Sequence, residues 1–414
     1  MLTFPTYLLK TGRVAPLAMA EAIVAQREAR PSLGDLAVQR GKTTKSLIEK
    51  LAVQQRRRKT RIGQMAVDAG VLTRDDVDAL LEEQSNLEPD LVDVLVQRGA
   101  LSRDVAEGER DRFREIERDI FARGGTRESR AQDSFACSVA RLASMKPFSS
   151  SVREALDLLA APDTAPAKVA AVLETDPAIT VVTLRVANSA MYRRGTPCDS
   201  LKDAVVRLGA GTLRDIVIGV SLLGAFADAD RIANTIRQHV AGAAAIARIL
   251  AAAAAPKLAN VAFLAGLTHD IGKLLLHQSG EFAYEALPRD AFEGSGKLHV
   301  LEAEALGYDH AVLGGLAVSL WELPKIVADA VTFHHEPLGA HVFGGDTARL
   351  TSILVLANEL EHHQSLSPHY TALVERELAN HPEARELGLE PSTVEEIWVE
   401  LVHARAEMAA LLAR

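Results

Sequence analysis

The sequence predicts an all-α protein. Its 414 residues are 48% apolar and only 4% aromatic, and alternating runs of β-branched residues are scarce. Apolar residues instead recur three and four positions apart, as in Val169, Val172 and Leu173, which is the spacing of one face of a helix. A 29-residue repeat near the N-terminus is a second indication, because periods of this size are typical of stacked supersecondary units. We therefore expect tandem helical hairpins, a helical linker and a larger helical domain.

The repeat spans residues 1–115, and the residues that end and begin helices indicate where its helices lie. Glycines and glutamines recur at the 29-residue period: Gly12, Gly41, Gly70 and Gly99, and Gln26, Gln55 and Gln84. A short helix that ends at Gly41 can use the left-handed backbone that suits glycine there, and Thr44 can cap the helix that follows. Thr73 with Asp76 has the spacing of a capping box. Each unit is predicted to be a helix pair that buries its apolar face on the next.

Three further segments follow the repeat. Residues 116–144 read as a linker helix with a polar loop, because 123–133 is polar, contains glycine and has no periodicity. Residues 145–345 are denser in apolar residues and form the predicted main domain. Residues 346–414 are predicted to be a C-terminal helical extension.

Charge and cysteine content narrow the class of protein. The sequence has 46 basic and 55 acidic residues, and its net charge of −9 argues against nonspecific binding to DNA or to an anionic membrane. Cys137 and Cys198 are the only cysteines, which excludes a disulfide framework and fits a reducing compartment. The longest apolar run, 216–227, is shorter than the roughly 18 residues of a membrane span, and residues 1–13 lack a signal-peptide pattern. We expect a cytoplasmic protein without a membrane span.

The histidines are the candidate chemical groups. His269 and Asp270, in FLAGLTHDIGKLLLH, follow an apolar helix and offer a nitrogen and a carboxylate ligand side by side. That mixture suits Fe, Mn, Zn or Mg. Lys273 would lie close to a phosphate bound there. A structural interpretation stays open, in which His269 and Asp270 form a hydrogen-bonded pair at a helix end and Lys273 is a cation near a helix terminus.

The segment 145–345 resembles an HDOD domain, a branch of the HD superfamily of metal-dependent phosphohydrolases. The resemblance rests on segments that occur in the family's order: LETDPAITVVTLRVANSA, SLKDAVVRLGAGTLRDIVIG, FLAGLTHDIGKLLL, DHAVLGGLAVSLWELPKIVADAVTFHHEP and LTSILVLANEL. It implies a metal site in which His239, His269 and Asp270 match the first ligands. His310, His334 and His335 match histidines that the related HD-GYP phosphodiesterases add.

Two departures from the family pattern weaken the case for catalysis. The late aspartate of the superfamily would fall near Asn358, whose neutral amide is a weaker ligand than a carboxylate. The segment HHEPLGAH also lacks the Gly-Tyr-Pro of the HD-GYP enzymes. The resemblance therefore implies a regulatory or scaffolding module that is not catalytic and acts on other signalling proteins, as a monomer or a homo-oligomer. The alternative is a metal-dependent phosphodiesterase in which Lys273 steadies the phosphate.

The repeat has a resemblance of its own, to the N-terminal domains of type II secretion and type IV pilus ATPases, some of which bind cyclic di-GMP. The motif's candidate nucleotide-binding residues are Arg61, Ile62, Gly63, Gly70 and Gln84 in one unit, and Leu33, Gly34, Gly41 and Gln55 in the preceding unit. Ser32 and Asp90 replace the motif's arginine in two units, and neither can match a phosphate as a guanidinium does. The basic run 56–59 is an alternative source of phosphate contacts, or a solvated face.

The two resemblances together predict a bacterial signalling protein, with cyclic di-GMP as a candidate ligand. Its N-terminal module would sense a ligand or a partner, and its HDOD domain would pass the event on. An RNA-binding regulator has less support, because the acidic balance and the few aromatic residues offer no platform for base stacking.

Overall fold

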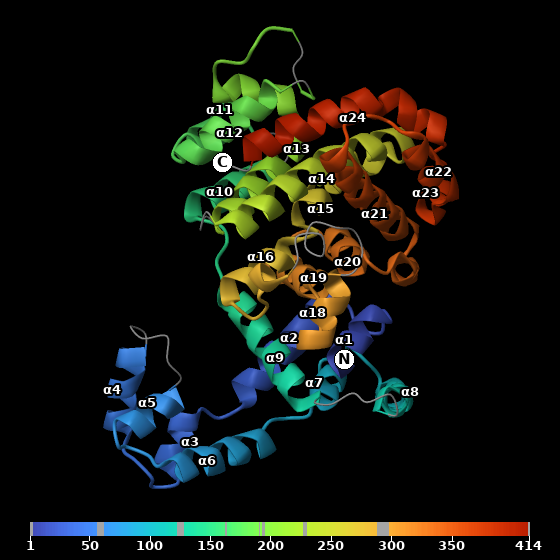
Figure 1. Cartoon of the computed structure of the whole chain (residues 1–414). Helices are drawn as coiled ribbons and strands as arrows, with labels where there is room; N and C mark the ends of the chain where they lie inside the picture. Colours follow the sequence, from blue (N-terminus) through green and yellow to red (C-terminus); the bar gives the residue numbers. More distant parts are fainter. Residues whose placement is uncertain are drawn as a thin grey trace. The chain divides into compact units, whose positions relative to one another are not determined.

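The computed structural model describes residues 3–55, 62–121, 128–161, 164–189, 191–192, 195–226, 230–287 and 298–412. These residues form helices, turns and loops, with no strand among them (Figure 1). The predicted all-α fold class is thus confirmed. Within the same ranges, no helix combines the length and the apolar character needed to cross a bilayer.

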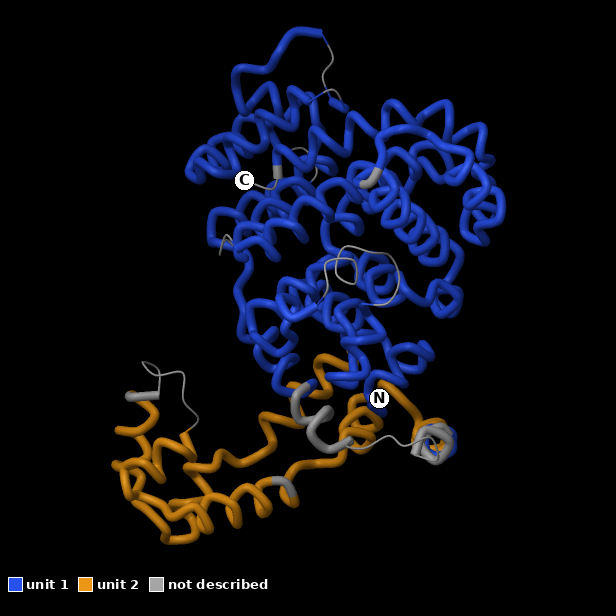
Figure 2. The backbone as a smooth tube through the Cα atoms, viewed as in Figure 1, with its two compact units in different colours: residues 1–17, 110–414 blue, residues 18–109 orange. Residues whose placement is uncertain are grey.

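The chain divides into two compact units (Figure 2). Residues 18–109 form the smaller unit, and residues 1–17 together with 110–414 form the larger one. The first helix thus packs with the larger unit, although the glycine period had extended the repeat to the N-terminus. The domain boundaries inferred from the sequence stay a prediction.

Short and longer helices alternate in the smaller unit. They are α2 (Pro16–Ala29), α3 (Leu33–Gln39), α4 (Lys45–Gln55), α5 (Ile62–Asp68), α6 (Arg74–Asn86), α7 (Leu91–Gln97) and α8 (Arg103–Phe121), of which α2 and α8 continue into the larger unit. Gly41, Gly70 and Gly99 have φ angles of 69°, 65° and 73° just after the short helices, as the period predicted. Thr73 and Asp76 form the reciprocal capping contacts, with each side chain accepting from the other residue's backbone N–H.

The larger unit holds the candidate chemical residues. Its helices are α1 (Phe4–Lys10), α9 (Glu128–Ser144), α10 (Ser150–Ala160), α11 (Pro166–Leu173), α12 (Pro177–Ala187), α13 (Leu201–Gly224), α14 (Arg231–Ala254), α15 (Ala259–Thr268), α16 (Ile271–Ser279), α18 (Leu298–Leu306), α19 (His310–Leu320), α20 (Lys325–Phe333), α21 (Gly345–Leu366), α22 (Ala372–Asn380), α23 (Pro382–Leu387) and α24 (Pro391–Leu412). Helix α14 packs against α15, α21 and α24 (Figure 1).

Small side chains allow these helices to pack closely. The alanine-rich part of α14 is buried, and a Cβ atom at Gly266 of α15 would lie 2.4 Å from the Cα atom of Ala244. Helices α16 and α19 approach even more closely, because a Cβ atom at Gly272 would lie 2.0 Å from the carbonyl oxygen of His310. This approach fixes the distance between the segment that carries Asp270 and the segment that carries His310.

We expect Gly272→Ala to lower the free energy of unfolding by about 1–3 kcal/mol, the usual range for overpacking a well-packed interior. The methyl group would meet backbone atoms, which cannot turn aside as a flexible side chain can. Denaturant unfolding of the full chain measures the effect. The control is Gly224→Ala at the exposed end of α13, where a Cβ meets nothing within 4 Å. Equal stability of the two variants would contradict the close approach.

A second expectation concerns pH, because α13 buries a carboxyl group. Asp215 is 1% exposed, and the nearest cation is Arg214, whose Nε atom lies 3.7 Å from Oδ1. Burial raises the pKa of Asp215 to about 7, although Arg214 and Arg248 oppose the rise. The folded state therefore binds more protons than the unfolded chain between about pH 4 and 7, and stability falls as the pH rises through this interval.

The variant Asp215→Asn cannot ionise, so it should gain stability relative to the wild type as the pH rises. We expect the difference in unfolding free energy between variant and wild type to grow by about 2.5 kcal/mol from pH 5 to pH 8. Denaturant unfolding at both values measures the change, and any constant effect of the amide cancels. Asp199→Asn, at an exposed position, is the control and should show no such change. A pH-independent difference for Asp215→Asn would refute the expectation.

Candidate metal centre

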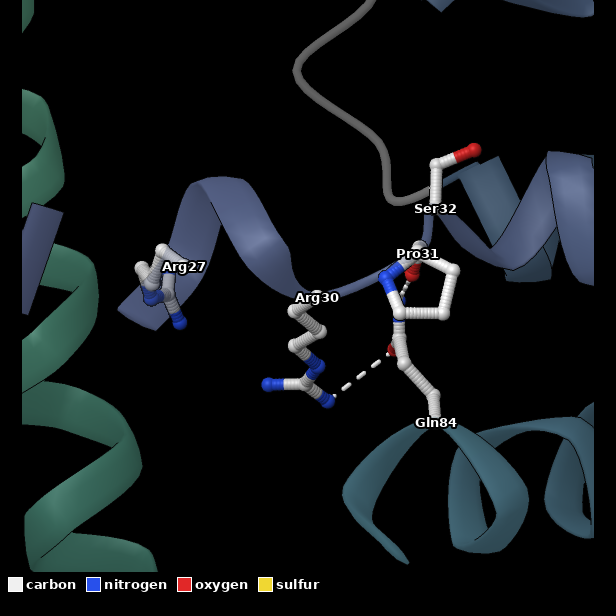
Figure 3. Close-up of a pocket in the computed structure, with 5 residues that line it drawn as sticks. All are labelled: Arg27, Arg30, Pro31, Ser32 and Gln84. Carbon is white, nitrogen blue, oxygen red and sulfur yellow. Dashed lines mark hydrogen bonds between the residues drawn. The ribbon is translucent and has the colours of Figure 1, made fainter. Parts of the chain in front are cut away.

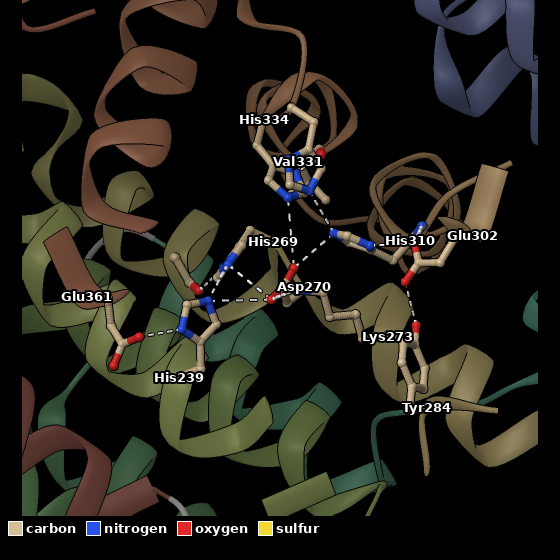
Figure 4. Close-up of polar contacts among 12 residues, drawn as sticks. His239, His269, Asp270, Lys273, Tyr284, Glu302, His310, Val331, His334 and Glu361 are labelled. Carbon is tan, nitrogen blue, oxygen red and sulfur yellow. Dashed lines mark hydrogen bonds and ion pairs between the residues drawn. The ribbon is translucent and has the colours of Figure 1, made fainter. Parts of the chain in front are cut away.

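Separate segments of the larger unit carry the predicted ligands to one place (Figure 4). His239 lies on α14, and His269 and Asp270 form the turn between α15 and α16. His310 begins α19. His334 and His335 lie in the turn after α20, so the two adjacent rings are not held on opposite sides of a helix. The structure therefore brings together every histidine and the aspartate that the resemblance implied: His239, His269, Asp270, His310, His334 and His335.

One oxygen of Asp270 faces two histidines. Its Oδ2 atom lies 3.5 Å from His239 Nε2 and 3.4 Å from His269 Nε2. The two nitrogens are 3.2 Å apart. Two ligand atoms that each lie about 2.1 Å from a metal are about 3.0 Å apart at right angles and about 3.4 Å apart in a tetrahedron. The three donor atoms are thus spaced as ligands of one ion would be.

The other oxygen of Asp270 faces a second set of imidazoles. Its Oδ1 atom lies 3.1 Å from His310 Nε2 and 3.8 Å from His334 Nε2. His335 Nε2 lies 2.9 Å from His310 Nε2, and its ring stacks on His299 with centroids 4.1 Å apart. The carboxylate of Asp270 therefore stands between two groups of donor atoms, with one oxygen toward each (Figure 4).

Backbone carbonyls fix the orientation of two rings. His269 Nδ1 lies 2.8 Å from the carbonyl oxygen of Gly266, and His334 Nδ1 lies 2.7 Å from that of Val331. A carbonyl oxygen can only accept, so Nδ1 carries the proton and Nε2 keeps a lone pair. Nε2 of His334 is buried and has no hydrogen-bond partner among the described residues. Both lone pairs point toward Asp270.

Carboxylates fix the two other rings in the same way. His310 Nδ1 lies 2.6 Å from Glu302 Oε2, and His239 Nδ1 lies 2.5 Å from Glu361 Oε2. A carboxylate or carbonyl that accepts from the outer nitrogen is the usual support of a metal-binding histidine. The donor set therefore fits a divalent metal, and it was this outer support that the sequence did not reveal.

The supporting carboxylates are themselves held by hydrogen bonds. Glu302 is fully buried and also accepts from the backbone N–H of His310 at 2.8 Å and from the Tyr284 hydroxyl at 2.7 Å. Glu361 accepts from Arg405 of α24, with Nε at 2.8 Å. In the sequence these acids look like solvent-exposed residues of polar helix faces.

The charges of the centre follow from burial and from these partners. Burial lowers the pKa of His269 to about 4 and holds that of His334 well below its usual value. Burial would raise the pKa of Asp270, but His269, Lys273 and His310 together keep it well below its usual value. Burial would lower the pKa of His310, but Glu302 and Asp270 together raise it to about 9. The centre therefore presents an ionised carboxylate to the neutral rings of His269 and His334, and His310 has to release a proton when it binds a metal.

Lys273 and Asn358, the two further residues named from the sequence, lie differently from the histidines. The Lys273 ammonium lies 2.5 Å from Asp270 Oδ2, so it is the ion-pair partner of the central carboxylate. Asn358 lies on α21, and its Oδ1 atom is buried with no hydrogen-bond partner in the part of the chain that the structure describes. The same helix supplies Glu361 and also His362, whose ring stacks on His239 at 4.7 Å. The sequence analysis missed His362; the roles of Lys273 and Asn358 as ligands of phosphate or metal stay predictions.

The smaller unit contains a polar pocket at one of the predicted nucleotide-binding residues. Arg27, Arg30, Pro31, Ser32 and Gln84 line a cavity of about 330 Å³ (Figure 3). Arg30 donates to Gln84 Oε1 at 3.0 Å and also pairs with Glu88 at 2.9 Å. Gln84 donates in turn to the carbonyl oxygen of Pro31 at 2.6 Å. The pocket therefore offers guanidinium groups beside a fixed amide.

Other residues of the predicted nucleotide motif lie at helix contacts and turns. A Cβ atom at Gly34 would lie 2.5 Å from Ile48, and one at Gly63 would lie 3.2 Å from Leu33. Ile62 packs on the same apolar cluster as Leu33. Gly41 and Gly70 occupy the helix-ending turns described above. Arg61, the basic run 56–59 and the side chain of Gln55 lie outside the described residues.

Comparisons with known proteins bear on the fold of the larger unit. Residues 145–337 match the family model of the HDOD domain. An HDOD domain protein of unknown function from Geobacter sulfurreducens is similar in structure, with 23% identity and a TM-score of 0.53 over 69% of this chain and 98% of that chain. A candidate phosphohydrolase from Shewanella amazonensis SB2B is similar at 23% identity and a TM-score of 0.53 over 66% of this chain and 97% of that chain. At this identity, both likenesses show the fold.

A curated relative is similar over a shorter stretch. An uncharacterized protein of Treponema pallidum (strain Nichols) is 23% identical over 176 residues, or 42% of this chain. The matched stretch covers 34% of that relative's length. Together with the fold and the cluster around Asp270, the matched family model leads to one conclusion: residues 145–337 of this chain are an HDOD domain.

Proposed function

We propose that the protein is a signal-transduction protein whose HDOD domain holds a divalent metal at Asp270. The observation that carries the proposal is the orientation of the histidines. His239, His269, His310 and His334 each give the Nδ1 proton to a fixed acceptor and turn Nε2 toward the Asp270 carboxylate. The mixture of imidazole nitrogen and carboxylate oxygen favours Fe, Mn or Zn.

The proposed role of this centre is regulatory. Ligands from α14, α19 and the turns after α15 and α20 meet at one carboxylate, so a bound metal would hold these elements together. Other signalling proteins, or a second copy of the chain, would then bind the surface that these helices form. Lys273 on Asp270 Oδ2 and the neutral amide of Asn358 support a regulatory role over turnover, because they reduce the negative charge available to metals.

A second candidate function is a metal-dependent phosphodiesterase. The observation in its favour is that the two oxygens of Asp270 face two different groups of histidines, as a carboxylate between two metal ions would. When bound, the metal would supply a Lewis acid that polarises a phosphate oxygen. Lys273 is the residue of this chain that would hold the phosphate charge, and His362, which stacks on His239, offers an additional imidazole.

We expect the purified full chain to retain about one to two Mn, Fe or Zn ions per chain and to rebind them after chelation. His269→Ala and Asp270→Asn should each reduce this content at least about tenfold. His277→Ala is the matched control, because His277 lies on α16 and pairs with Asp230 and Glu285, away from the donor cluster. Elemental analysis measures the metal, and circular dichroism verifies that each variant is helical. A wild-type chain that also refuses added Mn²⁺, Fe²⁺ and Zn²⁺ would contradict the proposal.

The same variants separate the two candidate functions. Metal-loaded wild type and His269→Ala are incubated with bis(p-nitrophenyl) phosphate and with cyclic di-GMP. The regulatory role predicts equal background hydrolysis in both proteins. Hydrolysis that His269→Ala loses and His277→Ala keeps would establish the phosphodiesterase instead.

For the smaller unit we propose binding of cyclic di-GMP at the pocket of Arg27, Arg30 and Gln84. Guanidinium groups suit both a phosphate and the acceptor edge of guanine, and the amide of Gln84 is already fixed by Arg30 and Pro31. The resemblance of the repeat to cyclic di-GMP-binding domains supports this ligand. Binding there would be the event that the HDOD domain passes on.

We expect the full chain to bind cyclic di-GMP, and the double variant Arg27→Ala, Arg30→Ala to weaken the affinity at least about tenfold, since a charged hydrogen bond contributes that much. Isothermal titration calorimetry measures the dissociation constant. Arg103→Ala is the control, because this exposed arginine of the same unit pairs with Asp93 and does not line the pocket. No heat with the wild type, or equal affinity in the double variant, would reject this site.

A further inference from the structure

The N-terminal helix α1 lies against the loops that carry two of the metal-binding histidines. Thr3 donates its backbone N–H to the carbonyl oxygen of Gly307 at 3.2 Å, and the Thr6 hydroxyl donates to the same oxygen at 3.0 Å. Both threonines are buried. The start of α1 is therefore fixed to the turn just before α19, the helix that His310 begins.

The end of α1 carries a cation between two carboxylates. Lys10 Nζ lies 3.0 Å from Asp309 Oδ2 and also pairs with Glu336 Oε1. Asp309 is fully buried, and its other oxygen caps α19 by accepting from the Val312 N–H at 2.9 Å. Lys10 is thus the cation that accompanies a buried charge, and it ties the start of α19 to the segment after α20.

The two carboxylates that pair with Lys10 are sequence neighbours of two histidines of the proposed metal centre. Asp309 directly precedes His310, and Glu336 directly follows His335. Nε2 atoms of these two histidines face each other at 2.9 Å. One ammonium group therefore connects the residue before His310 to the residue after His335.

We infer that Lys10 is a positioning residue for the metal centre, and that α1 sets the distance between His310 and His335. The inference rests on the proposed metal site. According to this inference, the metal affinity of the HDOD domain depends on α1, a helix far from that domain in sequence.

The chain path makes this contact a route for regulation. Phe4 and Tyr7 of α1 pack on Phe113 of α8, with ring centroids 5.3 and 5.4 Å apart. The chain leaves the larger unit after residue 17 and returns at residue 110. The first connection leaves the larger unit seven residues after Lys10, and the second returns three residues before Phe113. A ligand-induced strain along either connection would reach α1, and through Lys10 the histidine pair.

The test measures metal affinity in the full chain. Lys10→Met keeps the length of the side chain and removes the charge, and Lys10→Arg keeps the charge. We expect Lys10→Met to weaken Mn²⁺ binding about tenfold, the usual effect of removing an outer support, and Lys10→Arg to restore most of the affinity. Lys202→Met, at an exposed lysine of α13, is the matched control and should bind as the wild type does.

A spectroscopic measurement distinguishes positioning from mere stability. The absorption bands of bound Co²⁺ report ligand geometry, so they should shift in Lys10→Met and return in Lys10→Arg. Should Lys10→Met fail to fold, Glu336→Gln replaces it, because the Glu336 side chain is 47% exposed and its loss spares the core. This variant should show a smaller loss of affinity and a shift of the same bands.

The outcomes separate this inference from the proposed function. A wild-type chain that binds neither Mn²⁺ nor Co²⁺ refutes the metal centre itself. A wild type that binds both, with Lys10→Met equal to it in affinity and in the Co²⁺ spectrum, refutes only the positioning role. A lower melting temperature of Lys10→Met with unchanged metal affinity and spectrum would also overturn the inference.

Discussion

The structure depends on one buried negative charge. Asp270 is 1% exposed, and a carboxylate removed from water is costly unless cations or donors surround it. The groups that surround Asp270 come from α14, α16, α19 and the turn after α20, so these elements have to meet at one point. The alanine-rich face of α14 and the glycines at 266 and 272 let the helices approach closely enough for this to happen. The packing of the domain and the geometry of the centre are therefore a single constraint.

A second layer of residues converts this packing into a defined donor set. Glu302 and Glu361 hold the rings of His310 and His239, and they are fixed in turn by Tyr284 and Arg405. Glu361 lies on α21 and Arg405 on α24, beyond the last residue that the HDOD family model matches. The C-terminal helices thus support the centre, and a chain shortened to the matched residues would leave His239 without its acceptor.

The sequence contained the donors, and it lacked the information that selects their partners. His269 and Asp270 stand out because polar residues end an apolar helix, and Gly41 and Gly70 stand out because a period repeats them. Glu302, Glu361 and His362 have no such mark: each is one polar residue among many on an amphipathic helix, and only tertiary packing decides which of them faces inward. Lys10 is even harder to predict from the sequence, because its partners Asp309 and Glu336 lie some 300 positions away. Local periodicity predicts helices and their ends, whereas contacts between distant helices depend on the whole fold.

The charges of the centre explain why a regulatory role is the better proposal. Asp270 is the single carboxylate between the two groups of imidazoles, and Lys273 already balances its charge at Oδ2. Asn358, the residue that the resemblance matched to the late aspartate of the superfamily, is a neutral amide. Glu361 is an outer charge, and Arg405 pairs with it. A divalent ion at this centre therefore meets little net negative charge, so its binding relies on the imidazole nitrogens and on their exact placement. A metal affinity that depends on the placement of imidazole nitrogens changes when a helix moves, and a sensor requires such a change. An enzyme has to keep its metal bound, and it therefore needs carboxylates that hold the metal even when the helices move.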